Sequence, residues 1–285
     1  MRDIHYRICD LNVNGKIRPI TLYSREDIAE QKELYRRYSR AFMDNTHDSV
    51  YSFVPGYSNY DAAVLSCYQA KLYKYFLKLD IYEYYPSMDR TAVFDTLRGF
   101  LSPNTADRIC RYAFCCPSGI SEGSPLSPAI SNVYLYCFDE LAAALPASFY
   151  VRYCDDILLL MNAEPTPYIR YIKDALAACA LEVNDEKLKT GFVSEGFPFV
   201  GYNVGREDIC VLYENVVSIT QKLYDTTDVK ARARIANGFR AYYRDARCLP
   251  LCRECIGFLN RYGNGLEKAL FQQKYGLDVW LDTVD

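Results

Sequence analysis

The chain has 285 residues, of which 50% are hydrophobic and 24% charged, so disordered, fibrous and low-complexity proteins are excluded and the length allows one multi-lobed unit or two domains. A formal net charge of −3 lacks the basic excess by which many nucleic-acid-binding proteins contact phosphate, so such binding would depend on local basic patches. No apolar run approaches the roughly 20 residues that span a bilayer and no signal-peptide pattern opens the chain, so we expect a cytoplasmic protein without membrane association.

The N-terminal region predicts a strand hairpin followed by two helices. Asn14-Gly15 lies between alternating residues of the segment 11–22, a strong signal for a two-residue hairpin turn. A helix is expected at about 26–43. After an irregular segment, a second helix is expected near 60–75, with Ser58 or Asp61 as its N-cap.

The central region predicts a sheet with helices. A short apolar strand over 75–81 carries Asp80 at its end, and a turn leads to helices at about 91–116. The loop at 118–132 contains two Gly and two Pro, and an apolar helix follows it.

Two further strands, 149–153 and 157–161, are separated by Cys154-Asp155-Asp156 and predict a hairpin. A helix near 166–180 and strands near 181–183 and 197–204 follow. This order indicates an antiparallel or mixed sheet with helices on one face, hence an α+β core.

From Val216 onward the pattern is helical. Ile235, Phe239 and Tyr242 form an apolar stripe, while three arginines share another face: Arg240, Arg244 and Arg247. A solvent-exposed face explains such a basic stripe, and contact with phosphate is the alternative.

Twelve cysteines are scattered along the chain, and without an export signal we expect reduced, buried thiols, including Cys67, Cys110, Cys116 and Cys137. Cys248, Cys252 and Cys255 have a spacing that could hold zinc, but a fourth ligand is not evident and the chain has two histidines, His5 and His47. The same spacing places all three on one helical face, so a core stripe is favoured.

Three acids follow the predicted strand ends, Asp80 after one strand and Asp155-Asp156 at a hairpin tip. Carboxylates on neighbouring strands repel one another unless cations lie between them. An Asp-only set suits Mg²⁺, and two such ions can hold the attacking and leaving oxygens of a phosphoryl displacement. A pair of aspartates in a turn is more often simply solvated, so the hypothesis depends on the joint arrangement.

Seven segments occur in the order of the motifs of reverse transcriptases, and the chain resembles that family over nearly its whole length, particularly its bacterial branch of group II intron, retron, diversity-generating and phage-defence enzymes. The segments are GKIRPI (15–20), FVPGYSNYDAA (53–63), LKLDIYEYYPSMD (77–89), EGSPLSPAISNVYL (122–135), YCDDILLL (153–160), LEVNDEKLKT (181–190) and FVGY (199–202).

The resemblance implies a right-hand polymerase fold, with fingers in residues 1–75 and the helices at about 91–118, a palm in 76–205 and a helical thumb in 206–285. It implies an RNA-directed DNA polymerase that uses two Mg²⁺ ions, or Mn²⁺ in their place, with dNTPs and a DNA or RNA primer. The expected partners are an accessory protein and a dedicated structured RNA that serves as the template. The implied setting is a bacterial retroelement, antiviral defence or diversity generation.

The resemblance also assigns roles to matching positions. Asp80, Asp155 and Asp156, with the carbonyl of Ile81, would hold the metal ions, and Lys187 would protonate the leaving pyrophosphate. Tyr85 matches the ring that excludes a ribose 2′-hydroxyl. The remaining nucleotide-binding positions are Lys16 and Arg18, which would meet the triphosphate, Glu83, Tyr84, Glu122 and Gly123. Arg240, Arg244 and Arg247 would contact the duplex.

Two departures from the family pattern affect substrate choice. Glu122 stands where the family usually has Gln, and it would either donate as a protonated acid or accept from a ribose hydroxyl. Val54 and Tyr57 replace arginines of the finger motif, which alters the expected grip on the template.

Three alternatives to a reverse transcriptase remain open. The first is a nucleic-acid-binding scaffold whose catalysis is dispensable, and the presence of all three acids weighs against it. The other two are an RNA-dependent RNA polymerase, against which Tyr85 argues, and a nucleotide cyclase, which would not explain the finger and thumb segments.

Overall fold

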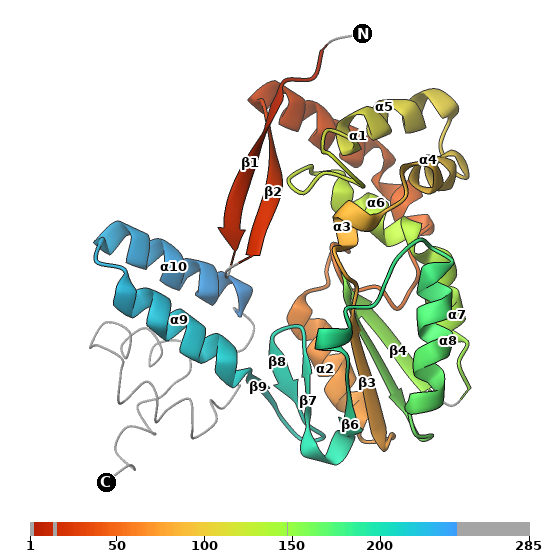
Figure 1. Cartoon of the computed structure of the whole chain (residues 1–285), viewed down its shortest axis with the longest axis vertical. Coiled ribbons are helices and arrows are strands. Elements are labelled where there is room, and N and C mark those ends of the chain that lie inside the picture. The colour runs from red at the N-terminus through yellow and green to blue at the C-terminus, as the bar shows by residue number, and fades with distance from the viewer. Residues whose placement is uncertain (1–2, 14–15, 147, 244–285) are drawn as a thin grey trace. The chain divides into compact units, whose positions relative to one another are not determined.

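The computed structural model describes residues 3–13, 16–146 and 148–243 (Figure 1). The chain forms two compact units, the first from Met1–Ser58 with Tyr75–Thr190 and the second from Asn59–Lys74 with Gly191–Asp285. Both contain helices and antiparallel strands, which confirms the predicted α+β class. Among the described helices, none is long and apolar enough to cross a membrane.

The first unit begins with the predicted hairpin. Strands β1 (Tyr6–Val13) and β2 (Lys16–Tyr23) are antiparallel, and Val13 lies opposite Lys16 across the turn. The expected helix follows as α1 (Arg25–Asp44), which begins after Ser24 because the Ser24 hydroxyl accepts the Asp27 N–H as an N-cap.

The main sheet has the strand order β4-β5-β3-β6. Its strands are β3 (Tyr75–Asp80), β4 (Ser148–Tyr153), β5 (Asp156–Met161) and β6 (Lys189–Phe192). The boundary between the first and the second unit falls inside β6. The inner strand β5 is a continuous apolar run whose residues 157–161 are all buried. In the register, Asp156 pairs with Asp80 on one side and with Tyr153 on the other.

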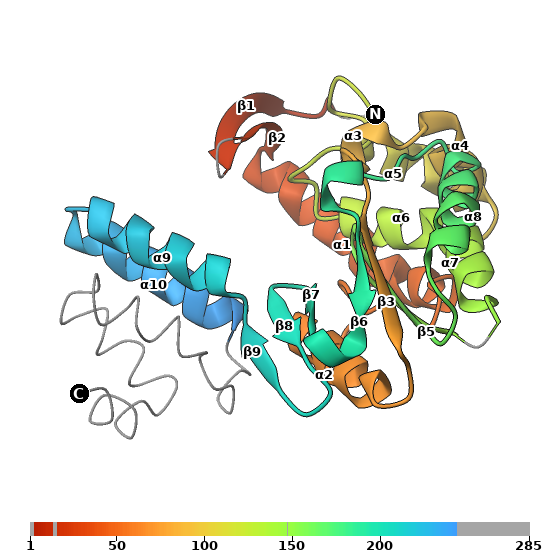
Figure 2. The same ribbon diagram turned by 60° about the horizontal axis from the view of Figure 1, so that its bottom comes forward.

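Helices cover this sheet and extend the first unit. In Figures 1 and 2, α7 and α8 lie beside each other, with α7 packed against β4. The segment expected as a loop at 118–132 instead becomes helical at Ser127, where Pro128 suits a first helical turn. The helices of this unit after α1 are α3 (Tyr84–Ser87), α4 (Arg90–Arg98), α5 (Pro103–Ala113), α6 (Ser127–Tyr134), α7 (Tyr136–Ala143) and α8 (Thr166–Ala177).

The second unit combines a three-stranded antiparallel sheet with helices. Its strands are β7 (Phe197–Phe199), β8 (Tyr202–Val204) and β9 (Ile209–Val211), and its helices are α2 (Asn59–Ala70), α9 (Tyr213–Asp225) and α10 (Val229–Tyr242). Helices α9 and α10 pack side by side (Figures 1 and 2).

Three expectations for local structure were wrong. The segment 197–204 is a hairpin rather than one strand, because Val200 and Gly201 both have positive φ and reverse the chain. Helix α2 ends at Ala70 rather than near 75, since Tyr75 already belongs to β3. The expected strand at 181–183 is only an isolated bridge between Val183 and Ile81.

The last residue of the predicted apolar stripe of α10 is also shifted by one position, from Tyr242 to Tyr243. Tyr242 is 49% exposed, whereas Tyr243 is 4% exposed and its ring packs against Tyr202 and Phe239. The C-cap residue of the helix, and not its last full member, therefore carries the aromatic contact with β8.

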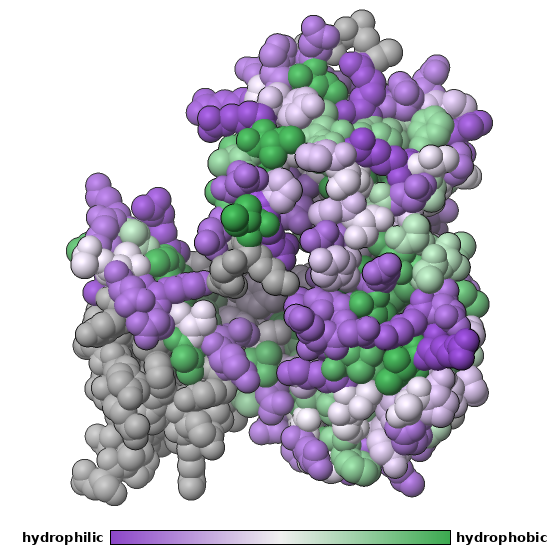
Figure 3. All heavy atoms as spheres, viewed as in Figure 1, coloured by the Kyte–Doolittle hydropathy of each residue, from purple (hydrophilic) through white to green (hydrophobic). Residues whose placement is uncertain are grey.

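The described cysteines are all free thiols, but only two are buried, Cys110 and Cys115. Cys137 is exposed, and Cys67 and Cys116 are partly exposed, so the expectation of buried thiols was wrong for these three. The segment of Cys248, Cys252 and Cys255 lies outside the described residues. The visible surface mixes hydrophilic and hydrophobic residues, with hydrophilic ones predominant (Figure 3).

Candidate active site

The predicted acids meet at one end of the main sheet in the first unit. Asp80 ends β3 and is 5% exposed, and Asp156 lies opposite it as the first residue of β5. Asp155 belongs to the turn between β4 and β5, and its carbonyl accepts the Ile81 N–H at 3.2 Å. The segment after Asp80 is thus tied directly to the turn that carries Asp155.

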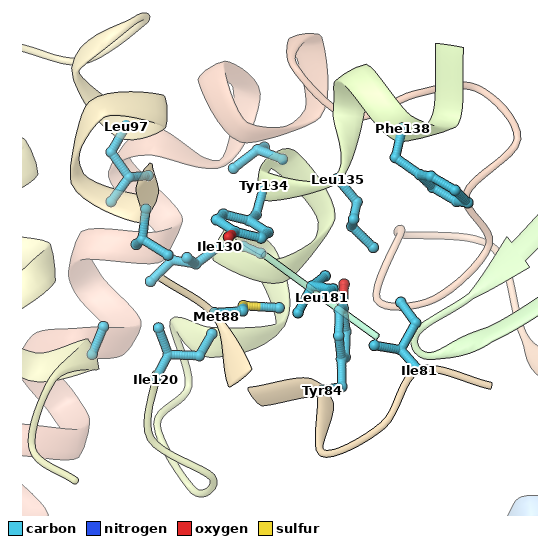
Figure 4. Close-up of a cluster of buried hydrophobic side chains, with 14 of the residues drawn as sticks. Ile81, Tyr84, Met88, Leu97, Ile120, Ile130, Tyr134, Leu135, Phe138 and Leu181 are labelled. Carbon is cyan, nitrogen blue, oxygen red and sulfur yellow. The ribbon is translucent and has the colours of Figure 1, made fainter. Parts of the chain in front are cut away.

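Buried side chains anchor the segment that follows Asp80 (Figure 4). Ile81, Tyr84 and Met88 pack into the core with residues of α6 such as Ile130 and Tyr134. Tyr84 also donates its hydroxyl to the Ser131 carbonyl at 2.9 Å. These contacts hold the backbone of the segment in which Asp80 and Tyr85 both line the cleft described below, while Tyr85 also packs against the edge of the core.

Burial and neighbouring charges raise the pKa of two of the acids, Asp155 and Asp156. Burial is the main cause that raises the pKa of Asp155 to about 6, and the charges of Asp156 and Asp80 add to it. Burial also raises the pKa of Asp156, against the opposing effect of Lys78. The group therefore holds concentrated negative charge that a cation would relieve.

A cleft of about 590 Å³ opens beside these acids. It brings together predicted residues that are far apart in sequence. They come from β2, the end of β3, the β4–β5 turn and the segment after α8. Its walls are formed by Ile17, Arg18, Pro19, Asp80, Ile81, Tyr82, Glu83, Tyr84, Tyr85, Pro86, Ser118, Glu122, Cys154, Asp155, Asn184 and Lys187. Asp156 and Gly123 are not among the residues that line it.

One wall of the cleft joins β2 to the loop before α6. The Arg18 guanidinium lies 3.6 Å from the Glu122 carboxylate, and the Thr21 N–H donates to the Glu122 carbonyl at 2.7 Å. Gly123 continues this contact: it has φ of +107°, and a Cβ there would lie 2.4 Å from the Thr21 carbonyl oxygen. The close approach that Gly123 allows is therefore to β2, and not directly to a molecule in the cleft.

Gly123→Ala is expected to destabilise the fold by about 1–3 kcal/mol, because alanine would combine a left-handed backbone with a clash against β2. Urea denaturation followed by circular dichroism measures the loss. Gly238→Ala is the matched control, since the space around Gly238 inside α10 is open, and alanine there is expected to stabilise by up to about 1 kcal/mol. Equal effects of the two substitutions would contradict the assigned role of Gly123.

Residues 10–204 match the reverse transcriptase (RNA-dependent DNA polymerase) family. The chain belongs to this family. The match includes β2 and part of β1, both strands that carry the acids, and the cleft walls.

Solved telomerase structures share the fold of this reverse transcriptase at low sequence identity. A Candida tropicalis telomerase truncated of its C-terminal domain has a TM-score of 0.52 and 17% identity, covering 73% of this chain and 55% of that one. The Candida albicans telomerase with a TWJ fragment of telomeric RNA has a TM-score of 0.51 and 15% identity, covering 98% and 64%. The corresponding Candida tropicalis complex has a TM-score of 0.56 and 13% identity, covering 94% and 54%. The chain thus spans little more than half of these telomerases, and the likeness is to a right-hand polymerase fold.

Two lysines of this reverse transcriptase pair with two of its three acids. Lys187 donates to Asp80 at 2.7 Å, and Lys78 donates to Asp156 at 2.6 Å. Asn184 adds a backbone bond to the Asp80 carbonyl at 2.8 Å. The sequence interpretation missed Lys78 and Asn184, although Lys78 stands two residues before Asp80 and so shares its face of β3.

The acids suit an oxygen-preferring divalent cation, because carboxylate side chains gather at this end of the sheet and line the cleft. However, the described residues contain no group of three His, Cys, Asp or Glu side chains arranged to hold a metal ion. Asp80 and Asp155 face the cleft, while Asp156 is paired with Lys78. Shared binding of metal by all three acids remains a prediction.

The other predicted contacts have different surroundings. Glu83 has a left-handed backbone, with φ of 41°, where it precedes α3. The Tyr85 ring stacks on Tyr84 at 5.4 Å between centroids and 21° between planes. Lys16 begins β2 and Arg240 belongs to α10, while two predicted residues lie outside the described part of the chain, Arg244 and Arg247.

Proposed function

We propose that this chain copies an RNA template into DNA by adding deoxynucleotides to a primer. In the proposed reaction the primer 3′-hydroxyl attacks the α-phosphate of a dNTP, the P–O bond to the β-phosphate breaks, and pyrophosphate leaves. The observation that carries this proposal is the single cleft in which Asp80 and Asp155 face Arg18, Tyr85 and Lys187.

The proposed cofactors are two Mg²⁺ ions, with Mn²⁺ as a substitute, held by Asp80, Asp155 and Asp156 with the Ile81 carbonyl. When bound, such ions favour ionisation of the primer hydroxyl and neutralise the charge that develops on the phosphates. Asp80 and Asp155 line the cleft and Asp156 does not, so Asp80 and Asp155 are the principal ligands of this proposal.

The cationic side chains of the cleft receive the triphosphate in this proposal. The Arg18 side chain is 49% exposed, so it can leave its ion pair with Glu122 and bind the triphosphate. A guanidinium binds two phosphate oxygens at once. Lys187 leaves Asp80 and donates a proton to the departing pyrophosphate, as a general acid. Tyr85 lies on the cleft wall, where its ring would exclude a 2′-hydroxyl.

The proposed partners are an RNA template, a DNA or RNA primer and dNTPs. A telomerase with the same fold has been solved with a fragment of its RNA, which supports an RNA partner by analogy. We further propose a dedicated structured RNA and an accessory protein, in a bacterial retroelement, an antiviral-defence system or a diversity-generating system. Three arginines, Arg240 of α10 together with Arg244 and Arg247, are proposed to contact the duplex backbone.

Primer extension with purified protein tests this function. RNA and DNA templates are each supplied with dNTPs or NTPs, with Mg²⁺ or Mn²⁺, and the full extension products are sequenced. Template-dependent DNA synthesis on RNA is the expected result, and a preference for ribonucleotides would overturn the proposal. Sequencing of RNA that co-purifies with the protein tests for the dedicated partner.

Metal affinity is expected to fall as the pH is lowered through about 6. Asp155 must be ionised to bind a cation, and its raised pKa means that protons compete for it below that pH. Between pH 7 and pH 5 the affinity for Mn²⁺ should drop at least about tenfold, because the ionised fraction of one carboxyl with a pKa of about 6 falls by that factor. Titration of Mn²⁺ followed by electron paramagnetic resonance measures this, and an affinity that is constant from pH 7 to pH 5 would contradict it.

A further inference from the structure

The turn that precedes the acids has an unfavourable backbone conformation. Cys154 has φ of 60°, in the left-handed region that non-glycine residues seldom adopt. A conformation of this kind persists only when surrounding contacts hold it. Because Cys154 comes directly before Asp155, whatever holds Cys154 also sets the position of the Asp155 carboxylate.

Side chains bind both backbone groups of Cys154. Its N–H donates to the Ser52 hydroxyl at 2.8 Å, and its carbonyl accepts from the Arg152 guanidinium at 3.2 Å. The Ser52 hydroxyl in turn donates to the side-chain oxygen of Asn132 at 3.3 Å, and the Asn132 amide donates to the Ser52 carbonyl at 2.8 Å. Ser52 and Arg152 are both fully buried, at 0% exposure.

Arg152 is itself fixed by a buried ion pair. Its Nε and Nη2 atoms each lie 2.7 Å from one oxygen of Asp139, which is also 0% exposed. Arg152 also donates to the Asn132 carbonyl at 3.2 Å and to the Tyr84 hydroxyl at 3.4 Å, and Tyr150 donates to Asp139. The guanidinium thus links α6, α7, the segment after Asp80 and the turn.

Fold stability alone is a weak reason for this arrangement. Removing two charges from water is costly, and apolar residues of similar volume often replace a buried ion pair without loss of stability. Apolar replacements would, however, leave the Cys154 carbonyl without its donor. The distinctive consequence of the ion pair is therefore geometric, and it falls on the turn.

We propose that Arg152 and Ser52 are positioning residues that hold the Cys154 turn so that Asp155 lines the cleft beside Asp80. This inference rests on the proposed function for its catalytic consequence. Neither residue lines the cleft, so neither is expected to touch the nucleotide.

Ser52→Ala is the mildest test, because it removes one hydroxyl and leaves the ion pair intact. We expect kcat for single-nucleotide incorporation to fall roughly 100-fold, as for a misplaced catalytic group, with the KM for dNTP within about twofold of wild type. Weaker Mn²⁺ binding and faster amide exchange in the peptide that contains Cys154 should accompany the loss. Ser66→Ala is the matched control, since Ser66 is equally buried but bonds only within α2, to the Ala62 carbonyl.

A second variant separates positioning from stability. The combined replacement Arg152→Met, Asp139→Leu and Tyr150→Phe removes both charges of the ion pair. It also removes the Tyr150 hydroxyl, which would otherwise lose its acceptor, Asp139. Its midpoint of urea denaturation should stay near wild type, while kcat falls by a similar factor of roughly 100. If this variant does not fold, the Ser52→Ala result decides.

Wild-type kcat, Mn²⁺ affinity and amide exchange in Ser52→Ala would overturn the positioning role. If the wild-type protein incorporates no nucleotide, the proposed function fails instead. The Mn²⁺ affinity and the amide exchange of Ser52→Ala then still decide whether Ser52 and Arg152 hold the turn.

Discussion

Asp155→Asn is expected to reduce the rate of nucleotide incorporation by about 1,000-fold or more, because it removes charge from the position where the phosphates are activated. Asp155 lines the cleft, and burial together with the charges of Asp156 and Asp80 raises its pKa, so it belongs to the electrostatic centre of the site. An asparagine has almost the same shape but cannot compensate a divalent cation. Single-turnover primer extension at saturating dNTP measures the effect.

Asp156→Asn is the matched comparison, and the two variants should behave differently. Asp156 does not line the cleft, and its carboxylate is 2.6 Å from Lys78, whose side chain is 12% exposed. Loss of this carboxylate leaves a nearly buried ammonium unpaired, so we expect destabilisation by about 1–3 kcal/mol. Its loss of kcat should be smaller than that of Asp155→Asn. Equal losses of kcat would show that Asp156 shares the metal site in spite of Lys78.

Tyr85→Ala is expected to lower discrimination against ribonucleotides by roughly 10- to 100-fold, the range by which a pocket rejects an added hydroxyl. The Tyr85 ring lies on the cleft wall and is kept in place by stacking on Tyr84. Alanine would open space beside the sugar without changing the acids. The measured quantity is the ratio of kcat/KM for a dNTP and the matching NTP.

Tyr85→Phe controls for the ring itself. It retains the planar surface and loses only the hydroxyl, so sugar discrimination should stay close to wild type. If Tyr85→Ala leaves the ratio unchanged, the assignment of Tyr85 as the gate is wrong. If Tyr85→Phe already relaxes the ratio, the hydroxyl and not the ring makes the selection.

The sequence was sufficient to place the strands that carry the acids. Asn14-Gly15 and Cys154-Asp155-Asp156 each separate short β-rich runs, and a hairpin depends mainly on such local signals. The meeting of Asp80 with Asp156 followed from strand ends on neighbouring strands. Short turns were less predictable, and the reversal at Val200 depends on a positive φ that Val rarely adopts.

Contacts made by side chains across the fold could not be predicted. The pairing of Lys78 with Asp156 requires the exact register of β3 and β5, and that of Arg18 with Glu122 requires the packing of β2 against the loop before α6. Arg152 appeared only as one residue of an apolar strand, since nothing in its local sequence indicates a buried partner on α7. The shift from Tyr242 to Tyr243 likewise depends on the ring of Tyr202.

Helix α2 has a consequence for biosynthesis. It belongs to the second unit, where Asn59 donates to the Val200 carbonyl and Cys67 to the Asp208 carbonyl. Its partners β8 and β9 are translated only after most of the first unit, roughly 6–30 seconds later at about 5–20 residues per second. During that interval the buried face of α2, which includes Ala62, Ala63 and Ala70, lacks its native contacts with β8 and β9. A nascent chain stalled before Phe197 should therefore engage general chaperones, and one extended past Val211 should release them.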